Sequence, residues 1–340
     1  MAIATQAFSP KQFSFLIAEQ DDWGTLNPNS GGSPDNSYHA LDVDSIGSPS
    51  LNVNQGLEHR SGSRILQASD FFQDIKGSVK EFSVSGTATR DALDLLLSNI
   101  TGKADVPYSV ASNAGTSTLT SATVNQTDQQ LLSVIYKSAY GTNADLAFKD
   151  VLCTTLSFNG DANTEGGRIK FSATFKTGSL ASDLTGSTTA IDTAITANNY
   201  YMSDWDADDR IIAGHANVIL SSFSLNITND VEFIGLTATG FESATRAGEV
   251  SATADFTCVY DSNTSSMFEN FNDQATGSSE GATLMATDDT PSNNEFEFKF
   301  ANSILTDVSF SDAGLMMVNA SVKAVGAGIG SSTALFEISC

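Results

Sequence analysis

The side chains that most often carry catalysis are few in this chain of 340 residues, and they are not grouped. None of the three histidines, His39, His59 and His215, stands at the spacing of a metal site or of a nucleophile and its base, so we expect each in a loop or on the surface. Gly160 and Gly166–Gly167 lack the lysine and serine that follow the glycines of a phosphate-binding loop. The residues therefore predict no catalytic site, no cofactor and a protein that is not an enzyme.

An acidic cluster comes nearest to a metal site. Its members are Asp204, Asp206, Asp208 and Asp209. The cluster lacks the turn glycine and the terminal glutamate of an EF-hand calcium loop. A solvated acidic loop is the favoured interpretation, and no metal is expected.

The three cysteines form neither a disulfide framework nor a metal-binding pattern. Cys258 shares the apolar phase of its strand with Ala254 and Phe256, which predicts a buried free thiol. Cys153 falls on the opposite phase of its strand, and Cys340 is the last residue.

Alternation of apolar and polar residues predicts that most of the chain forms antiparallel β-strands. In the segment 168–176, the apolar phase consists of Ile169, Phe171, Ala173 and Phe175. The segment 295–300 alternates in the same way. Such strands turn one face to a core and the other to water or to another polar surface.

Apolar residues at helical spacing predict three short helices. The first runs from Thr89, a possible cap, to Ile100 and is closed by Gly102. Its buried stripe consists of Leu93, Leu96, Leu97 and Ile100. The second helix is expected over 263–271, with Asn263 as its cap, and the third over 128–140.

The two halves of the chain carry similar patterns in the same order, which indicates an internal duplication. Segments 75–84, 152–158 and 171–176 match 246–256, 304–310 and 318–323, respectively. Each half also places a helix after its first matched strand. The region 103–145 has no clear counterpart, and we interpret it as an insertion that holds the third helix.

A chain of this length exceeds what one hydrophobic core usually serves, and the duplication places a boundary near Ala181. We expect two tandem antiparallel β-sandwich or barrel domains, each flanked by a short helix. The first, residues 1–180, has a long N-terminal loop and the inserted helix. The second comprises residues 181–340.

Two polar stretches, 21–56 and 181–210, are predicted to be long loops that contribute to contacts between subunits. They contain aromatic residues in polar surroundings: Trp23, Tyr200, Tyr201 and Trp205. These side chains are candidates for interface anchors, and a local core inside the loops is the alternative.

The net charge of −24 arises from a shortage of bases, with 16 Lys and Arg against 40 Asp and Glu. It is uneven, because residues 1–180 carry 12 bases and 18 acids whereas residues 181–340 carry 4 and 22. A surface that grips phosphates would be basic, which argues against tight binding to nucleic acid or to an anionic membrane. The sequence also lacks a long apolar run and the pattern of a signal peptide, so we expect folding in a cytoplasm.

One series of elements has a familiar order. From Gly77 to Gly102 a strand with a glycine, an alternating Val/Phe segment, the sequence Ser-Gly-Thr-Ala-Thr and a Leu-rich helix follow one another, and a hairpin over 152–178 closes the unit. This series resembles the major tail tube proteins of long-tailed, siphovirus-like bacteriophages, in their duplicated two-domain form. The resemblance implies a virion structural protein whose sandwich domains lie six to a ring, with rings stacked into a hollow tube.

For a two-domain chain the resemblance also implies homotrimeric, pseudo-hexameric rings. The implied partners are further copies of the chain and the tape-measure, tail terminator and baseplate proteins. DNA would pass through the tube without specific binding, and no membrane is involved.

Strand phase nominates the residues that would face the channel. If Phe82 and Val84 point to the core, Glu81 points away from it, and the same argument assigns Glu249 and Asp255 in the second half. We expect these three carboxylates to face the lumen and to make it negative, so that DNA phosphates find no partner there.

Two other functions fit the sequence. A carbohydrate-binding or adhesive β-sandwich would use exposed aromatic residues such as Trp23, Tyr200 and Trp205 as its platform, although the missing secretion signal counts against it. Another virion component, such as a capsid-decorating or baseplate protein, would share the β-rich composition.

Overall fold

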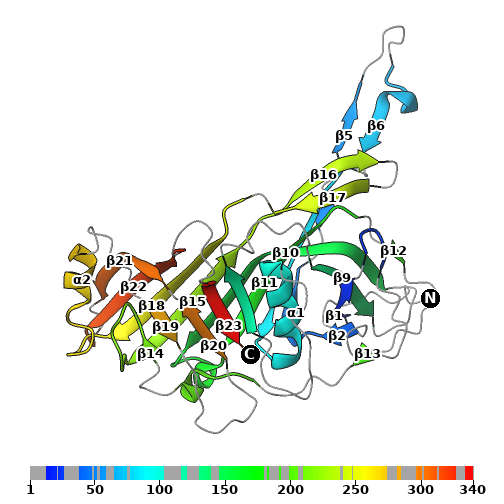
Figure 1. Cartoon of the computed structure of the whole chain (residues 1–340). Coiled ribbons are helices and arrows are strands. Elements are labelled where there is room, and N and C mark those ends of the chain that lie inside the picture. The colour runs from blue at the N-terminus through cyan, green and yellow to red at the C-terminus, as the bar shows by residue number, and fades with distance from the viewer. Residues whose placement is uncertain are drawn as a thin grey trace.

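The computed structural model is mainly β, with two short α-helices (Figure 1). It describes residues 13–20, 22–26, 38–47, 50–51, 54–58, 65–74, 77–102, 116–120, 130–138, 145–179, 182–183, 191–192, 199–205, 210–237, 240–246, 248–273, 282–284, 296–300, 302–311, 314–326 and 334–339.

The first half of the chain forms eleven of the described strands and the longer helix. These are β1 Phe13–Gln20, β2 Tyr38–Ala40, β3 Val43–Ile46, β4 Ser50–Leu51, β5 Asn54–Leu57, β6 Phe71–Asp74, β7 Lys80–Thr87, α1 Arg90–Thr101, β8 Thr116–Thr120, β9 Leu131–Ser138, β10 Leu146–Asp161 and β11 Lys170–Thr177. The 3-10 helices η3 Ala68–Asp70 and η5 Glu165–Gly167 lie between them.

The second half forms the remaining described elements. These are β12 Ser182–Asp183, β13 Ile191–Asp192, η6 Met202–Asp204, β14 Arg210–Ile211, β15 Leu220–Thr228, β16 Glu232–Thr237, β17 Gly240–Thr245, β18 Ser251–Val259, α2 Met267–Asp273, β19 Ala282–Leu284, β20 Glu297–Phe300, β21 Ser303–Ser311, β22 Met317–Ala324 and β23 Ala334–Ser339.

A large sheet of 14 strands crosses from one half of the chain to the other. Strand β10 joins them, because its last part pairs with β11 on one side and with β15 on the other. The described strands thus follow one another without a break in the order β7, β11, β10, β15, β18, β22, β21. The first part of β10 pairs instead with β9 and β12 and leads into β1, β2 and β13.

A second sheet of five strands, in the order β14-β19-β20-β23-β8, covers the apolar face of the large sheet. Phe298 of β20 lies against Phe223 and Phe256 of the large sheet, with ring centroids 6.1 Å and 6.3 Å away. Two hairpins, β5–β6 and β16–β17, extend away from both sheets (Figure 1). The chain is therefore a two-layer β structure with projecting hairpins.

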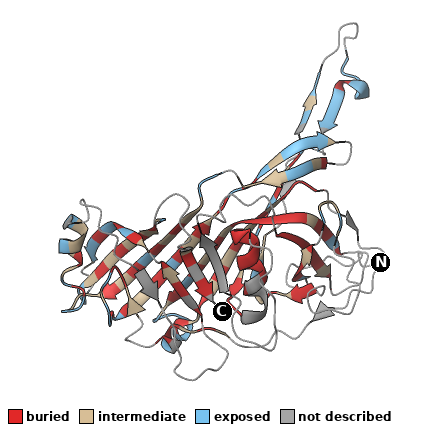
Figure 2. Ribbon diagram, in the orientation of Figure 1, coloured by how far each residue is buried: buried red, intermediate tan, exposed pale blue. Residues whose placement is uncertain are grey.

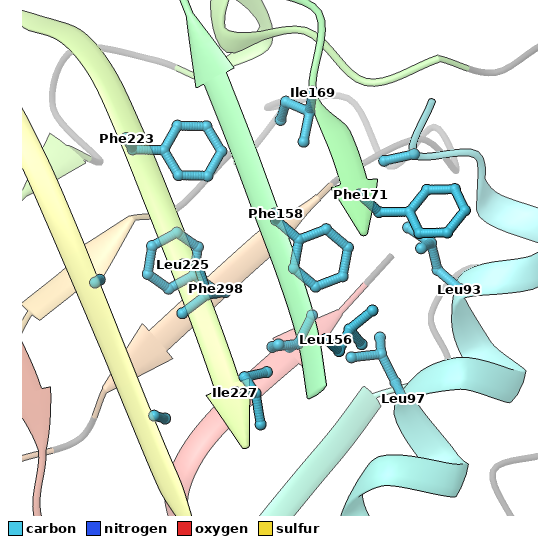
Figure 3. Packing of buried hydrophobic residues seen from close by; sticks show 14 of the residues in the cluster. Leu93, Leu97, Leu156, Phe158, Ile169, Phe171, Phe223, Leu225, Ile227 and Phe298 are labelled. Carbon is cyan, nitrogen blue, oxygen red and sulfur yellow. The ribbon is translucent and has the colours of Figure 1, made fainter. Parts of the chain in front are cut away.

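The core does not stop at the proposed boundary near Ala181. One cluster of buried residues contains Leu93 and Phe171 from the first half together with Leu225 and Phe298 from the second (Figure 3). Buried residues accordingly run along the whole length of the body, whereas the projecting hairpins are largely exposed (Figure 2). Both halves depend on this continuous core.

Helix α1 matches its prediction. It ends at Gly102, whose left-handed conformation (φ 69°) a residue with a Cβ rarely adopts. Its expected stripe is buried, and Leu93 and Leu97 point toward Leu156 and Phe171 (Figure 3). Thr89 occupies the cap position but makes no side-chain capping hydrogen bond.

The prediction of a helix over 128–140 is wrong, because Leu131–Ser138 forms strand β9 between β1 and β10. Leu132, Val134 and Ile135 are all buried, since both faces of this strand are covered. A strand buried on both faces carries a continuous apolar run, which resembles a buried helix in sequence.

Two further expectations need correction. The second helix, α2, begins only at Met267, since Asn263 lies in turns in which the Asp261 carboxylate accepts hydrogen bonds from the backbone of residues 263 and 264. The stretch 21–56 is not simply a loop, because strands β2 to β4 lie within it and β5 begins there.

Candidate functional site

One face of the large sheet is polar along strands β7, β11, β10, β15, β18 and β22. In β7, Phe82 and Val84 are buried while Glu81 is exposed, and in β18, Ala254 and Phe256 are buried while Asp255 is exposed. Glu249, just before β18, is exposed as well. All three predicted carboxylates are therefore exposed, and Glu81 and Asp255 alternate with buried residues along their strands.

Small uncharged side chains make up much of this face. They include Ser83 and Ser85 in β7, Ser157 and Asn159 in β10, Ser172 and Thr174 in β11, Ser224 and Asn226 in β15, Thr253 and Thr257 in β18, and Asn319 and Ser321 in β22. The Ser321 hydroxyl donates to Asp255 over 2.5 Å. Such a face offers many weak hydrogen-bonding groups and few charges.

The three lysines on this face have acidic partners. Lys170 Nζ lies 2.9 Å from Glu165, Lys176 Nζ lies 2.6 Å from Asp230, and Lys323 Nζ lies 3.0 Å from Glu249. The partners are solvent-exposed, so each pair adds little to stability. Their effect is to cancel positive charge on the polar face.

The hairpin between β10 and β11 is covered by residues of the second half. Backbone N–H of Ile169 donates to the carbonyl of Tyr200 over 2.9 Å, and the Arg168 guanidinium lies 5.8 Å from the ring centroid of Tyr201. Met202 packs against Gly160, where an added Cβ would lie 3.0 Å from its side chain. Residues far apart in sequence thus close this end of the hairpin.

The aromatic anchor candidates divide into two groups. Tyr200 and Trp205 are buried in the main core of the chain, and Trp205 Nε1 donates to the Phe296 carbonyl over 2.9 Å. Tyr201 is partly buried beside Arg168. Trp23 is also partly buried, and its Nε1 donates to the Phe241 carbonyl over 3.1 Å.

A polar cluster that the sequence analysis missed holds the two halves together. Asn229, which follows β15, donates its side-chain amide to the Ile100 carbonyl at the end of α1 over 2.7 Å. Arg246 donates to the carbonyls of Asn99, over 2.8 Å, and of Asn229. Cations and donors favour helix C-termini, so these contacts stabilise α1 from the other half. The scarcity of bases in the second half was the only signal for Arg246.

The projecting hairpins expose large apolar side chains. Leu57, Ile65, Leu66, Phe71 and Phe72 are exposed on or beside β5–β6, and Ile234 and Leu236 are exposed on β16–β17. Exposed apolar side chains that cluster in this way more often mark a surface that binds another molecule than one that stays in contact with water.

The sequence matches the family model described as phage tail tube protein over residues 12–333. The chain belongs to this family. A tail tube protein is a structural, non-enzymatic component of the virion tail and polymerises with copies of itself. No curated protein sequence gives a match.

Within the described ranges, no group of three or more His, Cys, Asp or Glu could hold a metal ion, and no helix is long and apolar enough to cross a membrane. His39 is buried in β2, contrary to the expectation of a surface position, whereas His215 lies in a turn. Asp206, Asp208, Asp209, His59 and Cys340 lie outside the described residues.

Both described cysteines of this tail tube protein are buried free thiols. The prediction for Cys258 is confirmed, and Cys153 is buried as well because β10 is covered on both faces at that point. Burial raises the pKa of each thiol to about 12.

Proposed function

We propose that this protein forms the tail tube of a siphovirus-like phage as stacked rings of three chains, in which residues 1–180 and 181–340 occupy alternating, quasi-equivalent positions. The observation that carries the proposal is the order of elements. The series β7, α1, β8, β9, β10, β11 is followed in the second half by β18, α2, β19, β20, β21, β22. Each series is preceded by a projecting hairpin, β5–β6 or β16–β17.

The strand registers support a duplication. Phe158 pairs with Phe171 in the first half, and Phe310 pairs with Val318 in the second. The register shifts at Thr154 in β10 and at Thr306 in β21. A bulge at matching places is a specific feature, since it interrupts regular pairing.

The two bulges also share a side-chain contact. The Thr154 hydroxyl donates to the Thr174 carbonyl over 3.3 Å, and the Thr306 hydroxyl donates to the Ser321 carbonyl over 3.1 Å. The strands β7 and β18 then match with Phe82 opposite Phe175 and Ala254 opposite Val322. In this alignment Phe82 and Val84 of β7 correspond to Ala254 and Phe256 of β18, and all four residues are buried.

We further propose that the polar face lines the channel. Glu81, Glu249 and Asp255 would make the lumen negative, and the lysines on that face are already paired with carboxylates. DNA binding depends on cations that replace the counterions of the phosphates. A surface of hydroxyls, amides and carboxylates would let the genome pass without holding it.

The projecting hairpins are the proposed contacts between rings, together with the stretches 21–56 and 181–210. Their exposed apolar residues would be covered in a stacked tube. The tape-measure protein inside the tube, and the terminator and baseplate proteins at its ends, are the other proposed partners.

Electron microscopy of the purified protein tests the proposed function. We expect hollow tubes, whereas discrete particles or soluble monomers under all assembly conditions would reject a tube-forming role for this chain.

Phage that carry Glu81→Lys, Glu249→Lys and Asp255→Lys together test the lumen assignment. We expect normal tails but slower genome ejection, because phosphates would find partners along the channel. The control is Glu269→Lys, at an exposed position of α2 outside the polar face and outside the projecting hairpins, which should leave the ejection rate unchanged. An unchanged ejection rate in the triple variant would refute the assignment.

A further inference from the structure

Strand β21 is the last described strand at one end of the large sheet. It pairs with β22 on one side, and no strand of the described ranges pairs with its other side. At the opposite end, β3 and β4 pair with β7 and with no further described strand. We propose that β21 of one chain pairs with the β3–β4 edge of a second copy, in the register that joins β10 to β15 within the chain. This inference rests on the proposed ring and specifies its closing contact.

Matching positions at the two hairpins differ in exposure. Phe158 and Ile169 of the β10–β11 hairpin are both 0% exposed, whereas their counterparts in the β21–β22 hairpin, Phe310 and Met316, are 47% and 45% exposed. Leu315 beside them is also exposed. The second hairpin therefore has apolar residues at the positions that are buried in the first hairpin, but here these residues are about half exposed.

The cover of the first hairpin identifies the missing partner. Phe158 lies against Phe296, with ring centroids 5.0 Å apart, and Ile169 bonds to the backbone of Tyr200. Both partners belong to the second half. If the halves are quasi-equivalent, the residues that cover Phe310 and Met316 come from the first half of the next copy.

The edge strand itself carries little protection against pairing. Natural edge strands are usually shielded by lysine, proline or inward-pointing charges. Strand β21 has neither lysine nor proline, and Asp307 is its one charged residue. Phe310 is held against Phe268 and Tyr260, with ring centroids 4.1 Å and 5.1 Å away, which forms a rigid aromatic surface beside the edge.

The register within the chain predicts the register between chains. Ser157 of β10 stands opposite Asn226 of β15. The bulge alignment makes Ser309 the counterpart of Ser157. Within the chain, Ser50 pairs with Glu81 and Asn226 pairs with Thr253. Glu81 and Thr253 are counterparts in the alignment of β7 with β18, so Ser50 is the counterpart of Asn226. Ser309 of one chain should therefore stand opposite Ser50 of the next.

A disulfide between these positions tests the inference. In a Cys340→Ser background, the variant Ser50→Cys/Ser309→Cys is assembled and oxidised, and the products are separated on a denaturing gel without reductant. A disulfide needs Cα atoms within about 7 Å, which opposite residues of an antiparallel pair satisfy. We expect a ladder that ends at three chains.

Two variants control the geometry. Ser157→Cys/Asn226→Cys should close within one chain and report that the internal register permits a bond. Ser45→Cys/Ser309→Cys places the second thiol four residues along the proposed pairing, about 13 Å away, and should not cross-link.

The outcomes separate the two proposals. Tubes that form without a cross-link between Ser50→Cys and Ser309→Cys, while the internal control closes, would overturn the edge contact and leave the proposed function standing. A ladder that ends at six chains would confirm the edge contact and contradict the three-chain ring. If the double variant fails to assemble, Phe310→Asp decides the matter, because normal ring assembly by that variant would overturn the inference.

Discussion

The hairpins β10–β11 and β21–β22 have the same register and the same threonine bulge, but they end in different surroundings. The first is buried against Phe296, Tyr200 and Met202 of its own chain. The second leaves Phe310 and Met316 half exposed. The comparison teaches that one pattern of residues can form core in one place and an exposed surface in another, depending on which segments of the chain pack against it.

A second difference concerns the contacts that hold each junction. The internal junction has the contacts of Asn229 and Arg246 with the end of α1, in addition to strand pairing. For the edge of β21, the described residues offer strand backbone and an aromatic surface. We expect the internal junction to persist in the free monomer and the edge contact to form only on assembly.

Removal of a buried ring should have the largest effect on the monomer. Phe158→Ala leaves a cavity in the continuous core and is expected to lower the free energy of unfolding by about 3–5 kcal/mol. Urea denaturation of the monomer measures it. A loss below about 1 kcal/mol would mean that the first hairpin is not core, and the comparison would fail.

Loss of the contacts that Arg246 makes should lower the free energy of unfolding by a smaller amount. Arg246→Met leaves the carbonyls of Asn99 and Asn229 without these donors, and we expect a loss of about 1–3 kcal/mol in the free energy of unfolding. Lys299→Met, a cation of the second half outside the junction, is the control. Equal effects of the two substitutions would show that the cluster does not hold the halves together.

A substitution at the corresponding position of the second hairpin should have only a small effect on the stability of the monomer. Phe310→Asp loses the contact with Phe268 and is expected to lower the free energy of unfolding by about 1 kcal/mol, while ring assembly is abolished because a charge enters the covered surface. Sedimentation velocity separates monomers from rings. Ile219→Asp, at a similarly exposed apolar position, should assemble normally.

The smallest expected effect is a difference in thiol labelling. With Cys340 replaced by serine, Cys153 and Cys258 should both resist a thiol reagent at pH 8, because burial raises each pKa to about 12 and the thiolate is the reactive form. The slow rate of labelling then measures how often the structure around each buried thiol opens to solvent. We expect Cys258, in the half with the uncovered edge, to react faster in the monomer and to lose this advantage in tubes. Equal monomer rates would argue that the open edge does not weaken its half.

Local patterns were sufficient to predict much of the fold. The αL glycine at residue 102 and the leucine stripe fixed α1, and strict alternation placed the carboxylates of β7 and β18 on the face away from the core. Strand β9 was missed because an element covered on both faces loses its alternation. The burial of Trp205 depends on a segment 91 residues away, and the contact of Arg246 with Asn99 spans 147 residues. No local pattern refers to segments so distant in sequence.

The number of chains in a ring is the most direct test of the proposed assembly. Cryo-electron microscopy of tubes assembled from the purified protein, reconstructed without imposed rotational symmetry, measures it. We predict three chains per ring, with the halves alternating around the channel and β21 of each chain against β3 and β4 of the next. Rings of six chains, or halves that do not alternate, would contradict the account.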